Sequence, residues 1–422
     1  MNIRILPPEE MIETEIYLPL SKSMSNRALL MDALTDRGQR KPFNVAECDD
    51  TDVMIKALAS SGKGEINIGA AGTAMRFLTA YYAATEGTDV TIDGIERMRQ
   101  RPISTLVDIL RECGADIEYK GEEGFPPLHI KGRRLHGGQL KMDASVSSQF
   151  VSALLMVAPT FDAPTTLTLE GELASLPYLD MTIKMMHCRG IDIERTGQEI
   201  EVRTGQYKVP ADTAIECDWS AASYWYTIAA LSAGWITLPG LTLPSLQGDS
   251  RLAEIFFKLG VVTNKEEGNI ELSASPEVYS RLDEDLSDTP DIAQTLVVAC
   301  CMLGVPFEFT GVSSLKIKET DRLEALRKEM LKFGCILNVE RGDSIKWDGR
   351  RTPILSLPEI DTYGDHRMAM AFAPAALYLP GIVIKDIEVV SKSYPGFWDD
   401  MRKAGFTLID AELPFDSQAL QQ

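Results

Sequence analysis

Residues 288–303 read DTPDIAQTLVVACCML, a polar start followed by a segment that is apolar almost all round. A polar residue before an apolar helical run is typical of a helix N-cap. A helix that has no polar face is buried inside a protein rather than laid on its surface. The stretch therefore predicts an interior helix.

The same design recurs along the chain. After the first occurrence the segments start roughly 70–75 residues apart, a period that indicates a repeated supersecondary unit rather than a solenoid. The other five are SKSMSNRALLMDAL from Ser21, AGTAMRFLTAYYAA from Ala71, SVSSQFVSALLMVA from Ser145, DWSAASYWYTIAAL from Asp218 and GDHRMAMAFAPAAL from Gly364.

Amphipathic helices and short strands fill the intervals. Several of the helical patterns end at a glycine, which is a C-cap signal. The glycines are Gly114, Gly260, Gly334 and Gly405. β-Branched runs such as DVTIDGI, WITLPG and GIVIKDI predict strands. The repeat is thus strand, buried helix, strands, amphipathic helix and strand, with three copies before about residue 215 and three after it. We expect an α/β protein of two lobes, because 422 residues are too many for one ordinary core.

Composition narrows the class of protein. The formal net charge is −20, which argues against a nucleic-acid or membrane-surface binder because both need a basic face. No apolar run reaches the roughly 18 residues that span a bilayer, and the start, MNIRILPPEEM, has no secretory pattern. The seven cysteines lack metal-ligand spacing, so we expect reduced, mostly packed thiols and a cytoplasmic location.

Cationic side chains gather near the starts of the apolar helices and in the loops beside them. Helix N-termini attract anions, and Arg and Lys placed there in so acidic a chain predict a site for a polyanionic ligand. They are Lys22, Arg27, Arg76, Arg101, Lys318, Arg322, Arg367 and Lys392. Each segment taken alone could instead be a solvated helix start or a structural network. His129, His136 and His187 have no partner pattern and are interpreted as structural or exposed. HExxH, CxxC and GxxxxGK[ST] motifs are absent, so we expect neither a metal site nor a P-loop kinase.

Taken together, the motifs resemble the 5-enolpyruvylshikimate-3-phosphate synthase family of enolpyruvyl transferases. The resemblance runs nearly end to end through LPLSKSMSNRALL, AGTAMRFL, RMRQRPI, SVSSQF, SLPYLDMT, PDIAQTL, KIKETDRL, YGDHRMAM and SKSYPGF. It implies a two-lobed, inside-out α/β barrel in which each lobe holds three βαβαββ units. Residues 21–215 would form the first lobe, on the shikimate-phosphate side. Residues 1–20 and 216–422 would form the second, with the active site in the cleft.

The resemblance also implies the reaction and its residues. Enolpyruvate would pass from phosphoenolpyruvate to the 5-hydroxyl of shikimate 3-phosphate, without metal or cofactor, in a monomer. The phosphoenolpyruvate site would use Lys22, Gly72, Thr73, Arg101, Gln149, Arg322, Arg367 and Lys392. The shikimate 3-phosphate site would use Lys22, Ser23, Arg27, Ser147, Ser148, Gln149, Ser175, Tyr178, Asp291, Ser314 and Lys318.

Four of the implied residues would carry the proton chemistry. Asp291 is our hypothesis for the base that takes the proton of the acceptor hydroxyl. Glu319 would handle the proton at C3 of the enolpyruvate, together with either Lys22 or Lys392. The choice among these three groups stays open.

The sequence departs from the family pattern at three positions. Ala70 stands where the family usually has Asn, Ser314 where many members have Asn, and Leu176 where a basic residue is common. None removes a proposed catalytic group, but Ala70 leaves the strength of binding of the inhibitor glyphosate open.

Three alternative functions are weighed against this one. The sister family that uses UDP-N-acetylglucosamine has a reactive Cys in a glycine-rich loop, whereas the comparable loop here, KGEEGFPPLHIKG, has none. Cys113 precedes Gly114 at a helix end, where packing is the expected role. A non-catalytic anion binder would not need Asp291 and Glu319 beside the cations. An unrelated phosphotransferase is disfavoured because no nucleotide loop is present.

Overall fold

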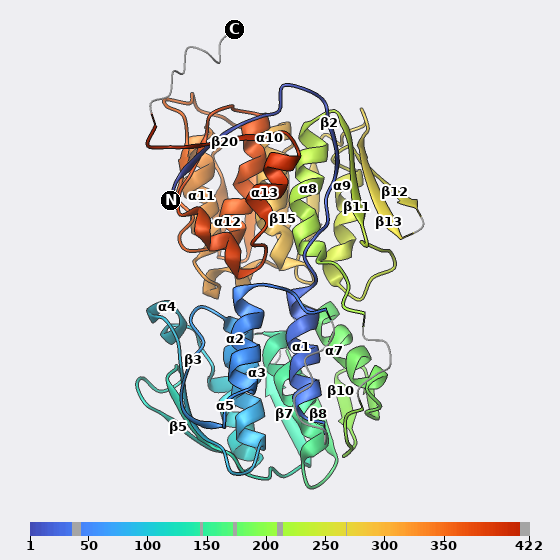
Figure 1. The fold of residues 1–422 in the computed structure, drawn as a ribbon, viewed down its shortest axis with the longest axis vertical. Coiled ribbons are helices and arrows are strands. Elements are labelled where there is room, and N and C mark those ends of the chain that lie inside the picture. The colour runs from blue at the N-terminus through green and yellow to red at the C-terminus, as the bar shows by residue number, and fades with distance from the viewer. Residues whose placement is uncertain (36–43, 144–146, 172–174, 209–213, 267, 414–422) are drawn as a thin grey trace. The chain divides into compact units, whose positions relative to one another are not determined.

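The computed structural model describes residues 1–35, 44–143, 147–171, 175–208, 214–266 and 268–413. The chain divides into two compact units (Figure 1). We call Leu20–Ile215 the first unit, and Met1–Pro19 together with Glu216–Gln422 the second unit. No helix of the described residues is long and apolar enough to cross a membrane.

One sheet topology recurs five times in the described chain. In each four-stranded sheet two neighbouring strands run parallel, and the other two form an antiparallel pair that joins the second of them. An example is the order β7 (Gln139–Asp143), β8 (Thr165–Glu170), β10 (Glu199–Val202) and β9 (Ile193–Thr196). In four of these sheets a helical segment connects the two parallel strands, as a parallel crossover requires, whereas in the fifth the chain passes through the whole first unit between them. Each complete copy is therefore a βαβαββ unit, as the family resemblance implied. The residue pattern had placed more than one strand before the amphipathic helix, whereas the strand pair follows that helix.

The first unit holds two of these sheets. One is built from β3 (Lys63–Asn67), β4 (Asp89–Asp93), β5 (Asp116–Tyr119) and β6 (Leu128–Lys131), and the other from β7 (Gln139–Asp143), β8 (Thr165–Glu170), β9 (Ile193–Thr196) and β10 (Glu199–Val202). Its helices are α1 (Lys22–Ala33), α2 (Asp49–Leu58), α3 (Gly72–Ala84), α4 (Glu96–Arg99), α5 (Ser104–Glu112), α6 (Ser148–Val157) and α7 (Leu176–Cys188). Helices α1 and α2 occupy the part of the sequence expected for the third copy. The described residues of this unit form no third sheet to go with them.

The second unit holds three such sheets. Their strands are β1 (Ile3–Leu6), β2 (Ile12–Glu15), β11 (Gly234–Pro239), β12 (Val261–Glu266), β13 (Asn269–Ala274), β14 (Leu282–Asp285), β15 (Phe307–Thr310), β16 (Asn338–Glu340), β17 (Ser344–Trp347), β18 (Glu359–Ile360), β19 (Val383–Ile384) and β20 (Thr407–Asp410). Its α-helices are α8 (Trp219–Leu231), α9 (Leu252–Phe257), α10 (Ala293–Leu303), α11 (Arg322–Lys332), α12 (His366–Phe372) and α13 (Phe397–Lys403).

The N-terminal strands complete sheets of the second unit. β1 pairs antiparallel with both β19 and β20, with Ile3 opposite Ile384, and β2 pairs parallel with β11. Two of the three sheets are therefore completed by strands from the first fifteen residues. This explains why Met1–Pro19 belongs to the unit that is otherwise built from Glu216 onward.

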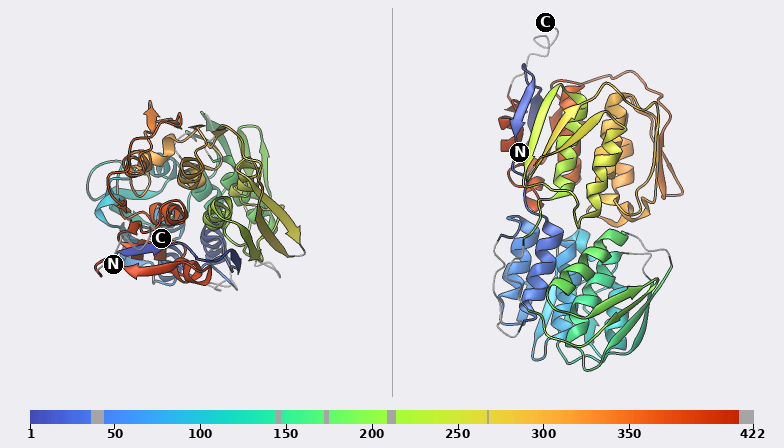
Figure 2. Two further views of the ribbon diagram at one scale, coloured as in Figure 1. Left: turned by 90° about the horizontal axis from the view of Figure 1, so that it is seen from above. Right: turned by 90° about the vertical axis from the view of Figure 1, so that its right-hand side faces the viewer.

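Helices fill the interior of the second unit and the strands lie outside them (Figure 2). α10 contacts both α8 and α12, and the residues of α10 from Ala293 to Met302 are all buried. Strands such as β14 alternate buried and exposed residues, as expected for a sheet with one face toward the core. The recurring apolar segments are thus the inner helices.

Prolines shorten two of the expected inner helices. The segment from Asp288 begins as a 3₁₀ turn, Pro290–Ile292, before α10. The segment from Gly364 ends as an α-helix at Phe372 and continues as a 3₁₀ turn, Ala373–Leu377. Proline lacks the N–H that an α-helix interior requires, so Pro374 ends the regular helix. The expectation of one continuous helix was wrong at both places.

Candidate active site

Arg322 lies at the centre of the charged cluster of the second unit. It is the first residue of α11, which is capped by the Asp321 side chain, and its own side chain is fully buried. Its guanidinium donates to Asp365 Oδ2 at 2.6 Å and to Glu319 Oε2 at 2.9 Å. A further N–H donates to Asp291 Oδ1 at 3.3 Å. The fork geometry of arginine lets this one side chain hold three carboxylates.

Asp291 receives two more cations. Arg367 Nη2 lies 3.1 Å from its Oδ2, and Arg367 Nη1 donates to its main-chain carbonyl at 3.0 Å. Lys318 Nζ lies 3.7 Å from its Oδ1. Burial by itself would raise the pKa of this carboxyl, but Arg367, Lys318 and Arg322 outweigh it and hold the pKa of Asp291 well below its usual range. Asp291 is therefore ionised at neutral pH, with a concentration of positive charge around it.

Glu319 and Lys392 form the neighbouring pair. Lys392 Nζ donates to Glu319 Oε1 at 2.7 Å, while the other oxygen of Glu319 accepts from Arg322. Lys392 is buried at the end of the 3₁₀ turn Ile387–Lys392. Ser314 is half-buried in the 3₁₀ turn Ser313–Ile317, which directly precedes Lys318. The structure thus brings Asp291, Glu319, Arg322, Arg367 and Lys392 into one network of ion pairs, with Lys318 at its edge.

Two carboxylates of this network were not among the predicted site residues. Asp365, the N-cap of α12, is fully buried and accepts from both Arg322 and the main-chain N–H of Arg367. Asp249 is also buried and accepts from the Ser220 hydroxyl, which in turn accepts from Arg367 Nη2 at 3.4 Å. The sequence Asp365-His366-Arg367, three polar residues that open an apolar helix, was a usable signal for Asp365. Nothing in the local sequence marks Asp249.

In the first unit, Lys22 opens α1 after the Ser21 cap and pairs with Asp50 of α2 at 2.9 Å. Asp50 was not predicted from sequence, although a buried lysine needs such a partner. The pair holds the ammonium at a helix N-terminus. Both side chains are mostly buried.

Arg27 is held by the protein itself. Its Nε donates to Thr182 Oγ1 at 2.7 Å, its Nη1 to the Ser23 carbonyl at 2.9 Å, and its Nη2 to Ser152 Oγ and the Tyr178 carbonyl. Burial lowers the pKa of Arg27 to about 10, so it stays charged at neutral pH. Four of its five N–H groups are used, which leaves at most one for a ligand. Arg27 therefore shapes the surroundings of Ser23 and Tyr178, and its predicted contact with shikimate 3-phosphate stays a prediction.

The first residue of α3, Gly72, packs closely against the Arg101 guanidinium. Arg101 is buried, and a Cβ added to Gly72 would lie 2.4 Å from its Nη1, so only glycine leaves room for this guanidinium. Gln149 Nε2 donates to Thr73 Oγ1 at 3.2 Å and thereby links α6 to the same helix start. Gly72, Thr73, Arg101 and Gln149 thus lie together.

The predicted serines lie at helix starts. Ser147 caps α6 and accepts from the Gln149 N–H, and Ser148 is the first residue of the helix. Ser175 precedes α7 with φ 58°, a left-handed conformation that costs a non-glycine residue about 1–3 kcal/mol and is found most often at functional sites. Tyr178 follows in the first turn, 5.7 Å from the Arg27 guanidinium.

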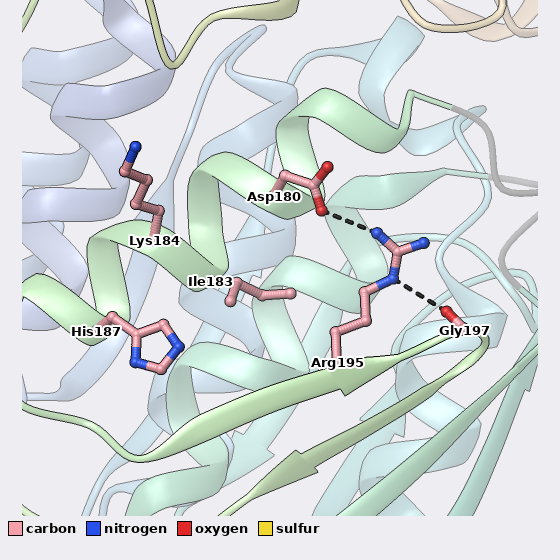
Figure 3. A pocket seen from close by; sticks show the side chains of 6 residues that line it. All are labelled: Asp180, Ile183, Lys184, His187, Arg195 and Gly197. Carbon is pink, nitrogen blue, oxygen red and sulfur yellow. Dashed lines mark hydrogen bonds and ion pairs between the residues drawn. The ribbon is translucent and has the colours of Figure 1, made fainter.

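A surface hollow of about 440 Å³ on the outer face of α7 is separate from these residues. In Figure 3, Arg195 from the β9–β10 hairpin is bonded to Asp180 and to the Gly197 carbonyl, and Lys184 and His187 line the same hollow. None of the predicted site residues lines it. No group of three His, Cys, Asp or Glu in the described residues is arranged to hold a metal ion.

Comparison with known proteins decides the family. The family model described as EPSP synthase (3-phosphoshikimate 1-carboxyvinyltransferase) matches residues 59–401. The chain belongs to this family. A relative named 3-phosphoshikimate 1-carboxyvinyltransferase from Bacteroides fragilis is 53% identical over 95% of this chain and 98% of its own, and one from Pectobacterium atrosepticum is 36% identical over 94% and 97%.

The solved structures agree on the fold. EPSP synthase from Acinetobacter baumannii superimposes with a TM-score of 0.74 at 20% identity, over 97% of this chain and all of its own. The α/β architecture and the enolpyruvyl transferase family expected from the motifs are therefore confirmed.

The surroundings of Cys113 argue against the sister activity, which uses UDP-N-acetylglucosamine and a reactive Cys. It is buried at the end of α5, and burial raises its pKa to about 12. A nucleophilic thiol needs the opposite shift, toward the thiolate at neutral pH. Cys113 is therefore a packing residue.

Proposed function

We propose that this chain transfers the enolpyruvyl group of phosphoenolpyruvate to the 5-hydroxyl of shikimate 3-phosphate and releases phosphate, a step toward chorismate and the aromatic amino acids. Membership of the family supports the reaction. The observation that carries the residue assignment is the convergence of Arg322, Arg367 and Lys318 on one carboxylate, Asp291. We further propose a cytoplasmic monomer that uses no metal or cofactor.

The cations are proposed to bind the anionic substrates. Lys22, Arg101, Arg322, Arg367 and Lys392 hold phosphoenolpyruvate, with Gly72, Thr73 and Gln149 beside it. Shikimate 3-phosphate is held by the remaining residues of the proposed site, in which hydroxyls at helix starts suit a phosphate and the Tyr178 ring suits the cyclohexene. These are Lys22, Ser23, Arg27, Ser147, Ser148, Gln149, Ser175, Tyr178, Asp291, Ser314 and Lys318.

The reaction proceeds by addition and elimination. Asp291 takes the proton of the 5-hydroxyl while the hydroxyl oxygen attacks C2 of phosphoenolpyruvate. C3 of phosphoenolpyruvate gains a proton, which gives a tetrahedral adduct that still carries the phosphate. C3 then returns its proton, the bond from C2 to the phosphate oxygen breaks, and the double bond re-forms. The contact between Lys392 and Glu319 supports this pair for the C3 proton. Nearby cations stabilise the charge that builds on the departing phosphate.

The lowered pKa of Asp291 has a mechanistic consequence. A carboxylate clamped by three cations is a weak base, because each cation stabilises the ionised form. Bound phosphate and carboxylate groups would share those same cations and raise the basicity of Asp291. We therefore propose that Asp291 becomes an effective base only when the anionic substrates are in place.

The direct test is an assay of phosphate release from phosphoenolpyruvate and shikimate 3-phosphate, without metal or nucleotide. Release that depends on shikimate 3-phosphate supports the proposal. Release with UDP-N-acetylglucosamine instead would identify the sister activity. Release with neither acceptor would favour an anion-binding role.

The Lys22→Met variant is expected to lower kcat on the order of 10²-fold, because it removes the ammonium while keeping most of the side chain. Steady-state kinetics of phosphate release measure this. Lys184→Met is the matched control, since Lys184 is an exposed residue of the same unit outside the proposed site. Equal loss in both variants would count against a specific role for Lys22.

Gly72→Ala is expected to raise the KM for phosphoenolpyruvate by roughly 10-fold, because the new methyl group would displace the Arg101 guanidinium. Gly205→Ala is the control: a Cβ there meets only Ile191 Cδ1 at 3.8 Å. The KM for phosphoenolpyruvate of both variants is measured with shikimate 3-phosphate held at saturation. An unchanged KM in Gly72→Ala would remove Arg101 from the phosphoenolpyruvate site.

A further inference from the structure

Asp249 is a buried carboxylate that the proposed reaction does not use. It lies in the 3₁₀ turn Gly248–Arg251 and is 3% exposed. One oxygen accepts from the Ser220 hydroxyl, and the other is buried without a hydrogen-bond partner among the described residues. Such an arrangement is costly, because an unsatisfied buried oxygen loses its hydration without compensation. A structural carboxylate would be expected to satisfy both oxygens.

The segment that carries Asp249 is firmly attached to the start of α8. Gln247 Oε1 accepts from the Trp219 N–H at 3.1 Å, and Gln247 Nε2 donates to the Cys217 carbonyl at 2.8 Å. Glu216 accepts from the Leu246 N–H at 3.1 Å. Side-chain and main-chain bonds therefore fix this turn against the helix that carries Ser220.

Ser220 connects Asp249 to the proposed catalytic cluster. Its Oγ accepts from Arg367 Nη2 at 3.4 Å, and the same nitrogen lies 3.1 Å from Asp291 Oδ2. Arg367 therefore sits between two carboxylates, one in direct contact and one reached through a hydroxyl. The orientation of its guanidinium depends on both.

We propose that Asp249 is a positioning residue for the reaction: through the Ser220 hydroxyl it fixes the Arg367 guanidinium, and its charge modulates how strongly Arg367 holds an anion. This inference rests on the proposed function, because it takes Arg367 as a phosphoenolpyruvate ligand. Asp249 itself touches no substrate in this scheme.

The electrostatic surroundings of Asp249 make its charge adjustable near neutral pH. Burial, reinforced by Asp291, raises the pKa of Asp249 to about 7, although Arg367 and the Ser220 hydroxyl oppose the rise. Asp218, the N-cap of α8, also faces it and adds to the rise. On its own turn, Arg251 is turned away to Glu284 at 2.7 Å. Ionisation of Asp249 would place a negative charge beside Arg367, which weakens the attraction of that guanidinium for an anionic ligand.

The test compares wild type, Asp249→Asn and Ser220→Ala across pH, with phosphoenolpyruvate varied at saturating shikimate 3-phosphate. In wild type we expect the KM for phosphoenolpyruvate to rise as pH increases through about 7. Asp249→Asn should lack that rise, because the amide fills the same space and does not ionise. Ser220→Ala should raise KM about 10-fold with a smaller change in kcat, as expected for losing a hydrogen bond to a charged group.

Asp400→Asn is the matched control. Asp400 is a partly buried carboxylate of the same unit that accepts from the Tyr394 hydroxyl at 2.6 Å, and burial raises its pKa as well. Its replacement should leave the pH profile of KM as in wild type. Superimposable profiles for wild type and Asp249→Asn would overturn the inference, as would a wild-type KM without any rise.

A stability measurement keeps this inference separate from the proposed function. An acid whose pKa is raised in the folded state stabilises the fold below its unfolded pKa, and that contribution is lost as pH rises through the folded pKa. The unfolding free energy of wild type should therefore fall relative to Asp249→Asn between about pH 4 and pH 7. Absence of this trend would overturn the inference even if the enzyme were inactive, whereas inactivity of wild type alone would count against the proposed function.

Discussion

Asp291→Asn is expected to lower kcat by about 10²- to 10⁴-fold, the range typical of losing a general base. The amide cannot accept the hydroxyl proton, yet it has nearly the shape of the carboxylate. Its single oxygen can still accept from Arg322, and the main-chain carbonyl of residue 291 keeps its bond from Arg367 Nη1. The loss should therefore appear in kcat more than in the KM for phosphoenolpyruvate. Steady-state phosphate release with both substrates at saturation measures it.

A suitable control is Asp285→Asn, at the exposed end of β14, where the carboxylate accepts from the Ser287 N–H at 2.9 Å. This variant should keep near-normal turnover. Near-normal turnover in Asp291→Asn would remove Asp291 as the base. Glu319 would then be the next carboxylate to test, because it shares Arg322 with Asp291.

The Arg322→Ala variant should lose both activity and stability. Truncation would leave Asp365, Asp291 and Glu319 without a shared cation at a buried position. Removing one partner of a buried ion pair typically costs about 3–5 kcal/mol, because the remaining charge is uncompensated. Urea unfolding followed by circular dichroism measures the loss, and phosphate release measures the activity. Arg322→Lys should recover only part of either, since an ammonium cannot reproduce the planar fork.

Arg327→Ala provides the comparison on the same helix. Arg327 makes two hydrogen bonds to Glu324, at 2.7 and 2.8 Å, but both side chains are exposed. Exposed pairs contribute about 0–1 kcal/mol, so this variant should remain close to wild type. A loss for Arg322→Ala no larger than that of Arg327→Ala would show that the buried network contributes little to the folded state.

Much of the fold could be predicted because its signals are local. The apolar segments are inner helices such as α8 and α10, and Gly114, Gly260, Gly334 and Gly405 all have positive φ after helix ends. Two helix caps were predicted at the right residue: Ser21 and Asp218 each accept a bond from the first turn that follows. The caps of α6 and α12 are Ser147 and Asp365, which come after the expected starts Ser145 and Gly364. The α-helical limits set by Pro290 and Pro374 were missed, because the apolar pattern continues across them.

The candidate site was predicted less completely. Motif positions supplied the cations together with Asp291 and Glu319, but not several of the other carboxylates and hydroxyls that orient the cations. Asp50 fixes Lys22, and Thr182 with Ser152 fixes Arg27. These partners lie on other helices, and nothing in their immediate sequence distinguishes them from ordinary helix residues.

The amino-acid sequence by itself determined the repeat, the inner helices and the family, because helix caps, apolar runs and glycine stops act over a few neighbouring residues. Only the tertiary structure decided that Arg322 and Arg367 meet at Asp291, and that Asp249 reaches them through Ser220. Charges interact through space, so the pKa of a carboxylate depends on which distant side chains the fold places beside it. For this reason two aspartates of the same unit carry opposite shifts, with the pKa of Asp291 lowered and that of Asp249 raised.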